Sequence, residues 1–435
     1  MIFDFLKYKD NTAVITDDGQ HLTYGELDAM VKSEAAKYKK NVLEFCLVDN
    51  SLESLVKYLA CLQAGAPAVM LDKHKASDMI DNLAEIYKPG ETECHPDVAL
   101  LLTTSGSTGS PKLVKLTAKN LLSNAESIAD YLHIDENERP ITSLPMYYSF
   151  GLSVINSHLL KGATILLTDY SVMQKEFWTF AKEAEATSIS GVPYTYEMLR
   201  RLRIFRMDLP KLKTMTQAGG KLNAKIAQEY IENAKAAGKR FVVMYGQTEA
   251  TARMSYLPDD KAVEKYASIG IAIPGGKFSL IGTDGNEITE PDVDGERIYE
   301  GENVSMGYAE CIADLAKGDE NHGVLHTGDV ARRDADGFYY ITGRLKRFVK
   351  IWGNRCNLDA TEQLVKSITT NCACAGVDDK ITIFVTEEGL DTEIKNLLSE
   401  KMGLNNRAFA VKVIAEIPKN AAGKVQYAEL QKMLD

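Results

Sequence analysis

In the first half of the chain, short apolar runs alternate with longer stretches of mixed polar and apolar residues. The apolar runs at 43–48, 66–71 and 98–102 predict buried strands, because they lack helical spacing and are too short for most helices. The segment 51–64 has helical spacing and ends at Gly65, which is typical of a helix C-terminus. Strands that alternate with helices indicate parallel pairing and therefore an α/β layer.

This alternation continues as far as about residue 245. A short hairpin is predicted at 13–22, and Thr23 with Glu26 is typical of a capping box that begins a helix reaching about Lys39. Further strands are expected at 142–145, 163–167, 187–191, 214–218 and 241–244, and further helices at 117–132, 153–160 and 193–202. Several of these strands end in loops rich in glycine, threonine and polar residues. Ligands of open α/β sheets bind at the carboxyl ends of strands, so these loops predict one shared site.

The pattern changes after about residue 268, where turn signals become frequent and the strands between them short. This texture predicts an antiparallel, barrel-like subdomain at about 268–343. From Arg344 onward the chain has a strand and helix pattern of its own, long enough for a small domain. A chain of 435 residues is too long for one core. We therefore expect a large N-terminal domain at 1–345 and a small C-terminal domain at 346–435.

Composition narrows the class of protein. Hydrophobic residues make up 45% of the chain and charged residues 26%, as in ordinary globular proteins. The net charge of −11 and the lack of a basic stripe argue against a nucleic-acid partner. Seven scattered cysteines predict reduced thiols, and Cys372 with Cys374 lacks the further ligands that a zinc site needs. With no signal-peptide pattern and no apolar run of membrane-spanning length, we expect a cytoplasmic protein; the sequence leaves its oligomeric state open.

The loop from Thr104 to Lys112 is the strongest candidate for ligand binding. It follows the apolar run 98–102 and precedes the helix expected from Thr117. Its bare backbone N–H groups, hydroxyls and single lysine suit a polyphosphate. The P-loop of kinases and GTPases would need glycine at 111 and serine or threonine at 113, where this chain has proline and leucine. The sequence therefore predicts a phosphate-binding loop of another kind.

Several motifs in a fixed order carry a resemblance to a known family. Thr104–Lys112 resembles the signature loop of the acyl-adenylate-forming superfamily, which includes acyl-CoA synthetases, adenylation domains of peptide synthetases and luciferase. The motifs that follow in the family's order are Tyr245-Gly-Gln-Thr-Glu249, Ser268–Gly275, His326–Asp329, Gly343-Arg344, Lys350–Gly353 and Pro418–Lys424. The resemblance covers nearly the whole chain. It implies an α/β fold with a large domain of αβ sheets, a small β-barrel-like part and a small mobile α+β C-terminal domain.

The resemblance also implies a ligase chemistry in which a carboxylic acid and ATP give an acyl-adenylate and pyrophosphate, with Mg²⁺. Lys112 and the loop before it would bind the β- and γ-phosphates through Thr104, Ser105, Gly106, Ser107, Thr108 and Gly109. Thr248 would contact the α-phosphate, and Thr104 and Glu249 would hold the metal ion. The rest of the nucleotide would be bound by Gly219, Gly220, Lys221, Tyr245, Gly246, Gln247, Asp329 and Arg344.

A second step would need a second arrangement of the C-terminal domain, which in this family rotates about a hinge. The hinge position here is Lys346. Lys424 would face the site for adenylation, where a lysine can bridge the carboxylate and α-phosphate oxygens. The loop around Gly353 would face it for transfer of the acyl group to a thiol, and Gly353 would line the pantetheine channel.

Departures from the family pattern bear on the substrate. Tyr148 stands where a histidine is common in acyl-CoA synthetases, and residues 147–151 contain no carboxylate to pair with an α-amino group. We therefore expect an acid without an α-amino group and CoA as acceptor, with carrier-protein loading, including that of an amino acid, as the alternative. Two further hypotheses are a non-catalytic nucleotide-binding relative and an oxidative second step like that of luciferase. The acyl pocket is expected to involve Tyr147, Tyr148, Gly151, Val192, Thr195 and Gly219–Leu222.

Overall fold

The computed structural model describes residues 2–74, 77–103, 112–419 and 425–434, and these residues form two compact units. The first unit comprises the described residues up to 278 together with 299–325. The second comprises 279–298 and the described residues from 326 onward. Each unit is described by itself below. The expected domain boundary between 345 and 346 stays a prediction.

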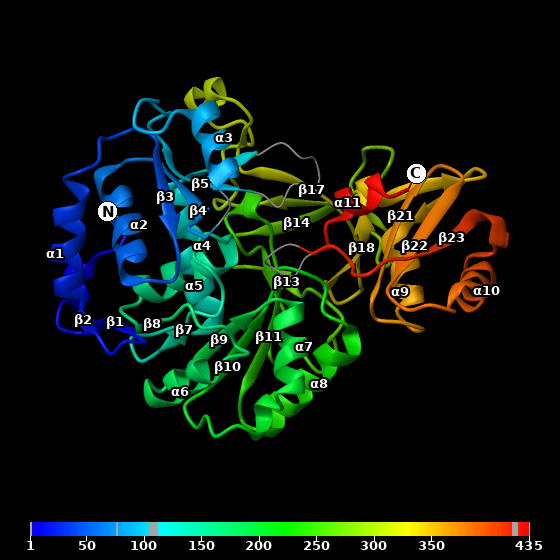
Figure 1. Cartoon of the computed structure of the whole chain (residues 1–435), viewed down its shortest axis with the longest axis horizontal. Coiled ribbons are helices and arrows are strands. Elements are labelled where there is room, and N and C mark those ends of the chain that lie inside the picture. The colour runs from blue at the N-terminus through cyan, green and yellow to red at the C-terminus, as the bar shows by residue number, and fades with distance from the viewer. Residues whose placement is uncertain (1, 75–76, 104–111, 420–424, 435) are drawn as a thin grey trace. The chain divides into compact units, whose positions relative to one another are not determined.

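A nine-stranded sheet forms one layer of the first unit, with strand order β13-β12-β11-β10-β9-β7-β8-β1-β2 (Figure 1). Its strands are β1 (Thr12–Thr16), β2 (His21–Thr23), β7 (Pro140–Ile141), β8 (Ile165–Leu167), β9 (Ser188–Gly191), β10 (Thr214–Gln217), β11 (Arg240–Tyr245), β12 (Ser255–Tyr256) and β13 (Ile271–Ala272). The strands from β1 and β8 through β7 and β9 to β11 pair in parallel, and the outer pairs are antiparallel. The predicted parallel α/β layer and the hairpin at 13–22 are confirmed.

A five-stranded sheet forms a second layer, in the order β16-β6-β5-β4-β3. Its strands are β3 (Glu44–Val48), β4 (Ala68–Asp72), β5 (Val98–Thr103), β6 (Leu113–Thr117) and β16 (Tyr308–Ala309). In β5, Leu100 and Leu102 pack into the core shared with the nine-stranded sheet, whereas Leu101 packs into a separate core on the opposite face. This alternation is the reason that every residue of a buried strand can be apolar.

Helices lie between the two sheets and on their outer faces (Figure 1). They are α1 (Tyr24–Ala35), α2 (Leu52–Ala64), α3 (Ser77–Tyr87), α4 (Ala118–Leu132), α5 (Ser149–Leu160), α6 (Lys175–Glu183), α7 (Pro193–Arg201) and α8 (Ala224–Ala236). The predicted capping box of α1 is present, because the Thr23 hydroxyl accepts from the Glu26 amide and the Glu26 carboxylate accepts from the Thr23 amide. Helix α2 ends as predicted at Gly65, which has a φ of 68°.

The expected passage from strand directly to helix after the phosphate loop is wrong. Strand β6 intervenes and pairs antiparallel with β5, with Thr103 opposite Leu113. The sequence conceals this strand because Lys115 interrupts its apolar run. The Lys115 side chain is fully buried, and its ammonium donates to the carbonyl oxygens of Asp314 at 3.0 Å and Lys317 at 3.2 Å. A lysine satisfied in this way can occupy a buried strand.

The other three sheets that the structure describes belong mostly to the second unit, together with the last three described α-helices. A four-stranded sheet, in the order β14-β15-β17-β18, is followed by the hairpin β19-β20 and the sheet β21-β22-β23. The strands are β14 (Lys277–Ile281), β15 (Gly295–Glu300), β17 (Val324–Arg333), β18 (Tyr339–Arg344), β19 (Phe348–Ile351), β20 (Asn354–Asn357), β21 (Cys372–Val377), β22 (Lys380–Val385) and β23 (Phe409–Val413), and the helices are α9 (Leu358–Val365), α10 (Asp391–Met402) and α11 (Tyr427–Lys432). The α+β mixture of strands and helices predicted for the C-terminal residues is confirmed.

The cysteines and the helices of the described residues bear on two expectations, reduced thiols and the lack of a membrane-spanning segment. All seven cysteines are free thiols, although the sulfur atoms of Cys46 and Cys61 lie 3.6 Å apart. Among the helices that the structure describes, none combines the length and the apolar character needed to cross a bilayer.

A buried histidine in α5 predicts a specific dependence of stability on pH. Burial lowers the pKa of His158 from 6.5 to about 4, against the opposing effect of the 2.8 Å hydrogen bond from Nδ1 to the Val154 carbonyl oxygen. Between these values the unfolded chain binds a proton that the folded chain does not, so stability is lost as pH falls from 6.5 towards 4.

We therefore expect His158→Gln to remove about 3 kcal/mol of the loss in unfolding free energy that wild type shows between pH 7 and pH 4. Urea unfolding of both proteins across this range is the measurement. Parallel pH profiles for the two proteins would contradict the buried neutral imidazole.

Candidate functional site

The loops after three neighbouring strands lie together at one edge of the nine-stranded sheet. Strands β9, β10 and β11 pair in parallel, and Gln217 lies opposite Gly191 on one side and Val243 on the other. The amide of Ala218 continues this pairing by donating to the Gly191 carbonyl oxygen at 3.2 Å. The carboxyl ends of these strands therefore meet, as predicted. This register brings the predicted residues Gly219, Gly220 and Lys221 beside those of the segment Tyr245–Glu249.

The backbone conformation at position 219 and the side chains around it both require glycine. Its φ is +81°, and a Cβ at this position would lie 2.5 Å from the hydroxyl oxygen of Tyr148 and 3.1 Å from Cγ1 of Val192. Tyr148 is deeply placed, and burial raises the pKa of its hydroxyl to about 12. The tyrosine therefore stays neutral at working pH and packs against the loop after β10. The two predicted acyl-pocket residues Tyr148 and Val192 are thus neighbours of Gly219.

In the loop after β11, the backbone at Gly246 lies very close to the backbone at Ala252. A Cβ on Gly246 would lie 1.8 Å from the carbonyl oxygen of Ala252, so only glycine fits there. The Gln247 amide nitrogen donates to the Tyr245 hydroxyl at 2.9 Å, and the Glu249 carbonyl oxygen accepts from the Ser305 amide at 2.9 Å. A short 3₁₀ helix, η3 (Thr248–Ala250), follows. These constraints fix the two predicted catalytic residues Thr248 and Glu249 side by side.

The side chains of Thr248 and Glu249 have partners from distant segments. The Thr248 hydroxyl lies 3.2 Å from that of Ser149 at the start of α5. The Tyr308 hydroxyl donates to Oε1 of Glu249 at 2.7 Å, and burial together with the Glu249 carboxylate raises the pKa of Tyr308. The Lys112 ammonium lies 5.5 Å from the centre of the Tyr308 ring and forms an ion pair with Glu310. Tyr308 therefore connects the predicted metal ligand to the predicted phosphate-binding lysine.

Glu249 offers a carboxylate, which is a ligand type that magnesium prefers. Among the described residues, the one cluster of three histidine, cysteine or acidic side chains close enough to share a metal ion is Asp49, His74 and Asp169, which does not include Glu249. The described residues therefore do not enclose Glu249 in an all-protein metal cage. Mg²⁺ is commonly held by one or two carboxylates, with waters and substrate phosphates completing the coordination. Glu249 is thus suited to a metal ion that arrives with a phosphate ligand.

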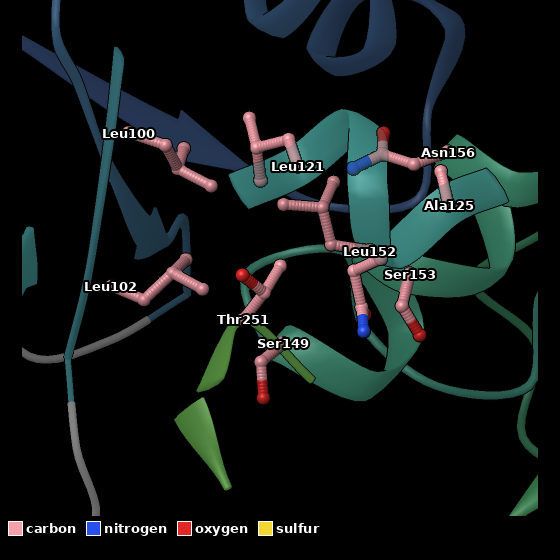
Figure 2. Close-up of a pocket in the computed structure, with 10 residues that line it drawn as sticks. Leu100, Leu102, Leu121, Ala125, Ser149, Leu152, Ser153, Asn156 and Thr251 are labelled. Atoms are coloured by element: carbon pink, nitrogen blue, oxygen red, sulfur yellow. The ribbon is translucent and has the colours of Figure 1, made fainter. Parts of the chain in front are cut away.

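A small cavity lies behind this loop, between α4, α5 and the strand β5 (Figure 2). Its volume is about 10 Å³, and Ser149, Ser153 and Thr251 contribute polar groups to a lining that Leu100, Leu102, Leu121 and Leu152 share. This is room for about one water molecule. The cavity is therefore too small for a nucleotide or an organic acid and is not the substrate pocket.

In the second unit, two predicted residues form a pair. Asp329 and Arg344 face each other across β17 and β18, and Nε of Arg344 donates to Oδ1 of Asp329 at 3.1 Å. Asp329 is buried, and the buried guanidinium of Arg297 lies 4.0 Å from its other oxygen, Oδ2. Such a carboxylate is fixed in direction, as one that binds a pair of ligand hydroxyl groups must be.

The presence of glycine at position 353 is explained by the turn in which it lies. It forms the two-residue turn of the β19-β20 hairpin with Trp352, with φ values of 87° and 49°. Two positive φ values are the mark of a type I′ turn, which favours glycine. No atom lies within 4 Å of a Cβ built on Gly353, so the turn alone accounts for the residue. Its role in a thiol channel stays a prediction.

Several predicted residues lie outside the described part of the chain. They are Thr104, Ser105, Gly106, Ser107, Thr108 and Gly109 of the phosphate loop, and Lys424.

Sequence reasoning missed Tyr308, Glu310 and Ser149 as site residues. Tyr308 reaches the site because β16 pairs antiparallel with β6, which places it opposite Val114. No local pattern around residue 308 signals this pairing between strands almost two hundred residues apart. Ser149 was within the segment singled out for its departure at Tyr148, but its contact with Thr248 depends on the packing of α5.

The structure is that of an α/β protein in which predicted ligand-binding residues gather at the carboxyl ends of parallel strands. The sequence profile of AMP-binding enzymes matches residues 73–309, and the chain belongs to this family.

Two curated relatives are similar to this chain over more than half of its length. The chain is 32% identical over 259 residues to feruloyl-CoA synthase from Amycolatopsis sp, an alignment covering 58% of this chain and 50% of the relative. It is 28% identical to oxalate–CoA ligase from Arabidopsis thaliana, with coverage of 84% and 72%. The chain thus spans about half the length of the feruloyl-CoA synthases that it matches.

Among solved structures, o-succinylbenzoate coenzyme A synthetase from Bacillus subtilis in complex with AMP superposes with a TM-score of 0.82. The superposition covers 98% of this chain and 97% of that one at 23% identity. This likeness supports the same fold.

The contact between Gly219 and Tyr148 generates a prediction about stability. Gly219→Ala should lower the free energy of unfolding by about 1–2 kcal/mol from its left-handed φ alone, and by more from the close Tyr148 hydroxyl. Adding Tyr148→Phe should restore part of the loss, because it removes the atom nearest to the new Cβ. Gly220→Ala is the matched control, since its Cβ would meet nothing closer than 3.2 Å. Urea unfolding of wild type, Gly219→Ala, Tyr148→Phe, their double variant and Gly220→Ala is the measurement, and strictly additive effects of Gly219→Ala and Tyr148→Phe would contradict the contact.

Proposed function

We propose that the chain is an AMP-forming acid–thiol ligase. A carboxylic acid and ATP give an acyl-adenylate and pyrophosphate, and the acyl group then passes to the thiol of CoA. Loading of a carrier-protein phosphopantetheine arm is the alternative second step. The observation that supports the proposal most is the linked set Thr248, Glu249, Tyr308 and Lys112 in a chain of the AMP-binding family. Thr248 and Glu249 follow the parallel strand β11, and Tyr308 joins Glu249 to Lys112.

The chemistry explains why these residue types would be needed. A carboxylate that attacks the α-phosphorus approaches a group of like charge, so positioning and cations dominate the barrier. Mg²⁺ held at Glu249 would supply neutralising charge to the phosphates. Lys112 adds a second cation, and its ion pair with Glu310 keeps its ammonium near the ring of Tyr308. Tyr308 orients the Glu249 carboxylate, and Thr248 offers a hydroxyl beside it.

The acid that we propose lacks an α-amino group. Residues 147–151 contribute two tyrosines, a serine, a phenylalanine and a glycine, so this segment has no carboxylate to form an ion pair with an ammonium. Relatives named feruloyl-CoA synthase, oxalate–CoA ligase and indoleacetate–CoA ligase favour CoA as the acceptor. A luciferin 4-monooxygenase from Nipponoluciola cruciata is also similar, at 24% identity, so an oxidative second step is one outcome that the experiment must distinguish.

The proposal predicts acid-dependent exchange of pyrophosphate into ATP. A panel of aryl, short-chain, fatty, hydroxy and amino acids should give exchange with one or more acids that lack an α-amino group. Product masses measured with CoA and with carrier protein offered separately identify the acceptor. Lys424→Ala should lower exchange by about 10²–10³-fold while ATP still binds. If no acid supports exchange, the chain is a non-catalytic nucleotide-binding relative.

The hydrogen bond between Tyr308 and Glu249 predicts a metal-specific defect. Tyr308→Phe should raise the Mg²⁺ concentration needed for half-maximal exchange by roughly tenfold, because Glu249 loses the donor that fixes its direction. Tyr38→Phe is a matched control, since the Tyr38 hydroxyl donates to Glu34 at 2.9 Å on the distant helix α1. An unchanged Mg²⁺ requirement in Tyr308→Phe would remove Tyr308 from the metal site.

A further inference from the structure

A cluster of buried charged groups lies in the second unit and has no role in the chemistry described so far. Arg347 and Glu362 are 8% and 4% exposed. Nη2 of Arg347 lies 3.5 Å from Oε2 of Glu362, and Nη1 donates to the Cys374 carbonyl oxygen at 3.1 Å. The guanidinium also pairs with Asp359 and lies 3.6 Å from the centre of the Tyr427 ring. The Arg347 guanidinium therefore contacts two carboxylates, a backbone carbonyl oxygen and an aromatic ring.

Glu362 is the acceptor at the centre of the cluster. The Tyr427 hydroxyl donates to its two oxygens at 3.2 and 3.1 Å, and the Cys374 amide donates to Oε2 at 3.1 Å. The ammonium of Lys366, the residue that follows α9, lies 3.1 Å from Oε1. Two cations and two carboxylates thus balance in charge. Burial and the Glu362 carboxylate raise the pKa of Tyr427, so its hydroxyl remains a donor at working pH.

This arrangement is better explained by orientation than by stability. Burying charged groups costs solvation energy, and apolar residues of similar size often stabilise a protein as well or better. Directional hydrogen bonds between buried charges, by contrast, hold side chains in one geometry. The cluster therefore fixes the elements that contribute to it: the residue before β19, helix α9, strand β21 and the first residue of α11.

Two of these elements lie at places in the chain that matter for the proposed reaction. Arg347 directly follows the predicted hinge residue Lys346, and Tyr427 lies three residues after Lys424. Lys419 and Val425, which flank residues 420–424 in the sequence, form a bridge, and the Gln426 amide donates to the Pro418 carbonyl oxygen at 2.8 Å. Tyr427 follows immediately. The buried cluster therefore begins one residue after these backbone contacts, on the C-terminal side of that segment.

We propose that Tyr427 and Glu362 are positioning residues for the adenylation step, which they serve by fixing the base of the segment that contains Lys424. Arg347 stacks on the ring of Tyr427 and ties this base to the chain just after the hinge. The inference rests on the proposed function, in which Lys424 acts in adenylation and not in thiol transfer. Tyr427 and Glu362 act through that segment and do not touch substrate.

Measuring the two half-reactions separately distinguishes a positioning role of Tyr427 and Glu362 from a purely structural one. Tyr427→Phe removes the hydroxyl and keeps the ring on Arg347, and Glu362→Gln removes the charge and keeps the shape. With the acid that gives the fastest exchange, both variants should lower kcat for ATP–pyrophosphate exchange by roughly tenfold or more, with KM for ATP nearly unchanged. Acyl transfer from supplied acyl-adenylate to CoA should stay at the wild-type rate.

The matched control is Glu429→Gln, on the same helix as Tyr427. Glu429 forms an exposed ion pair with Lys432 at 2.9 Å, and its loss should change neither half-reaction. Equal losses in both half-reactions would show a structural role and overturn the proposal. So would wild-type exchange in Tyr427→Phe.

Hydrogen exchange of the full chain keeps the inference testable if the ligase proposal itself fails. Wild type without acid-dependent exchange would refute the proposed function, whatever the variants do. In that case the Gln426 amide, protected by its bond to Pro418, should still exchange faster in Tyr427→Phe than in wild type and in Glu429→Gln. Equal protection in the three proteins would overturn the positioning role.

Discussion

The parallel pairing of β9, β10 and β11 is the constraint on which the candidate site depends. It sets three strand ends at one edge of the sheet, so that Gly219 and the segment Tyr245–Glu249 share a neighbourhood although some twenty-five residues separate them. The backbone of that segment approaches Ala252 so closely that only glycine fits at 246. Side chains then complete what the backbone arranges: Ser149 and Tyr308 fix Thr248 and Glu249, and Tyr308 adjoins Lys112.

Much of this could be predicted from the sequence because it rests on local signals. Apolar runs marked the parallel strands, Thr23 with Glu26 marked the start of α1, and Gly65 marked the end of α2. The ordered motifs identified the family, which the family profile confirms. The α/β fold, with a large part and a small α+β part, followed from the same motifs.

What the sequence could not show depends on pairing between distant segments. Strand β6 was hidden by Lys115, whose charge is satisfied by carbonyl oxygens some two hundred residues further along. Tyr308 enters the site only through the pairing of β16 with β6. The cluster of Arg347, Glu362 and Tyr427 has no sequence signature either, since each residue alone would read as an ordinary surface side chain. The assigned roles of the site residues stay predictions.

The central claim is that the acid's own carboxylate oxygen attacks the α-phosphorus of ATP. The most direct test supplies the active acid with both carboxylate oxygens as ¹⁸O, together with ATP, Mg²⁺ and CoA, and measures the label in the products by mass spectrometry. The account predicts one ¹⁸O in each AMP formed, because the bridging oxygen of the acyl-adenylate leaves with AMP when the thiol attacks. Label in inorganic phosphate, with ADP as the nucleotide product, would contradict it.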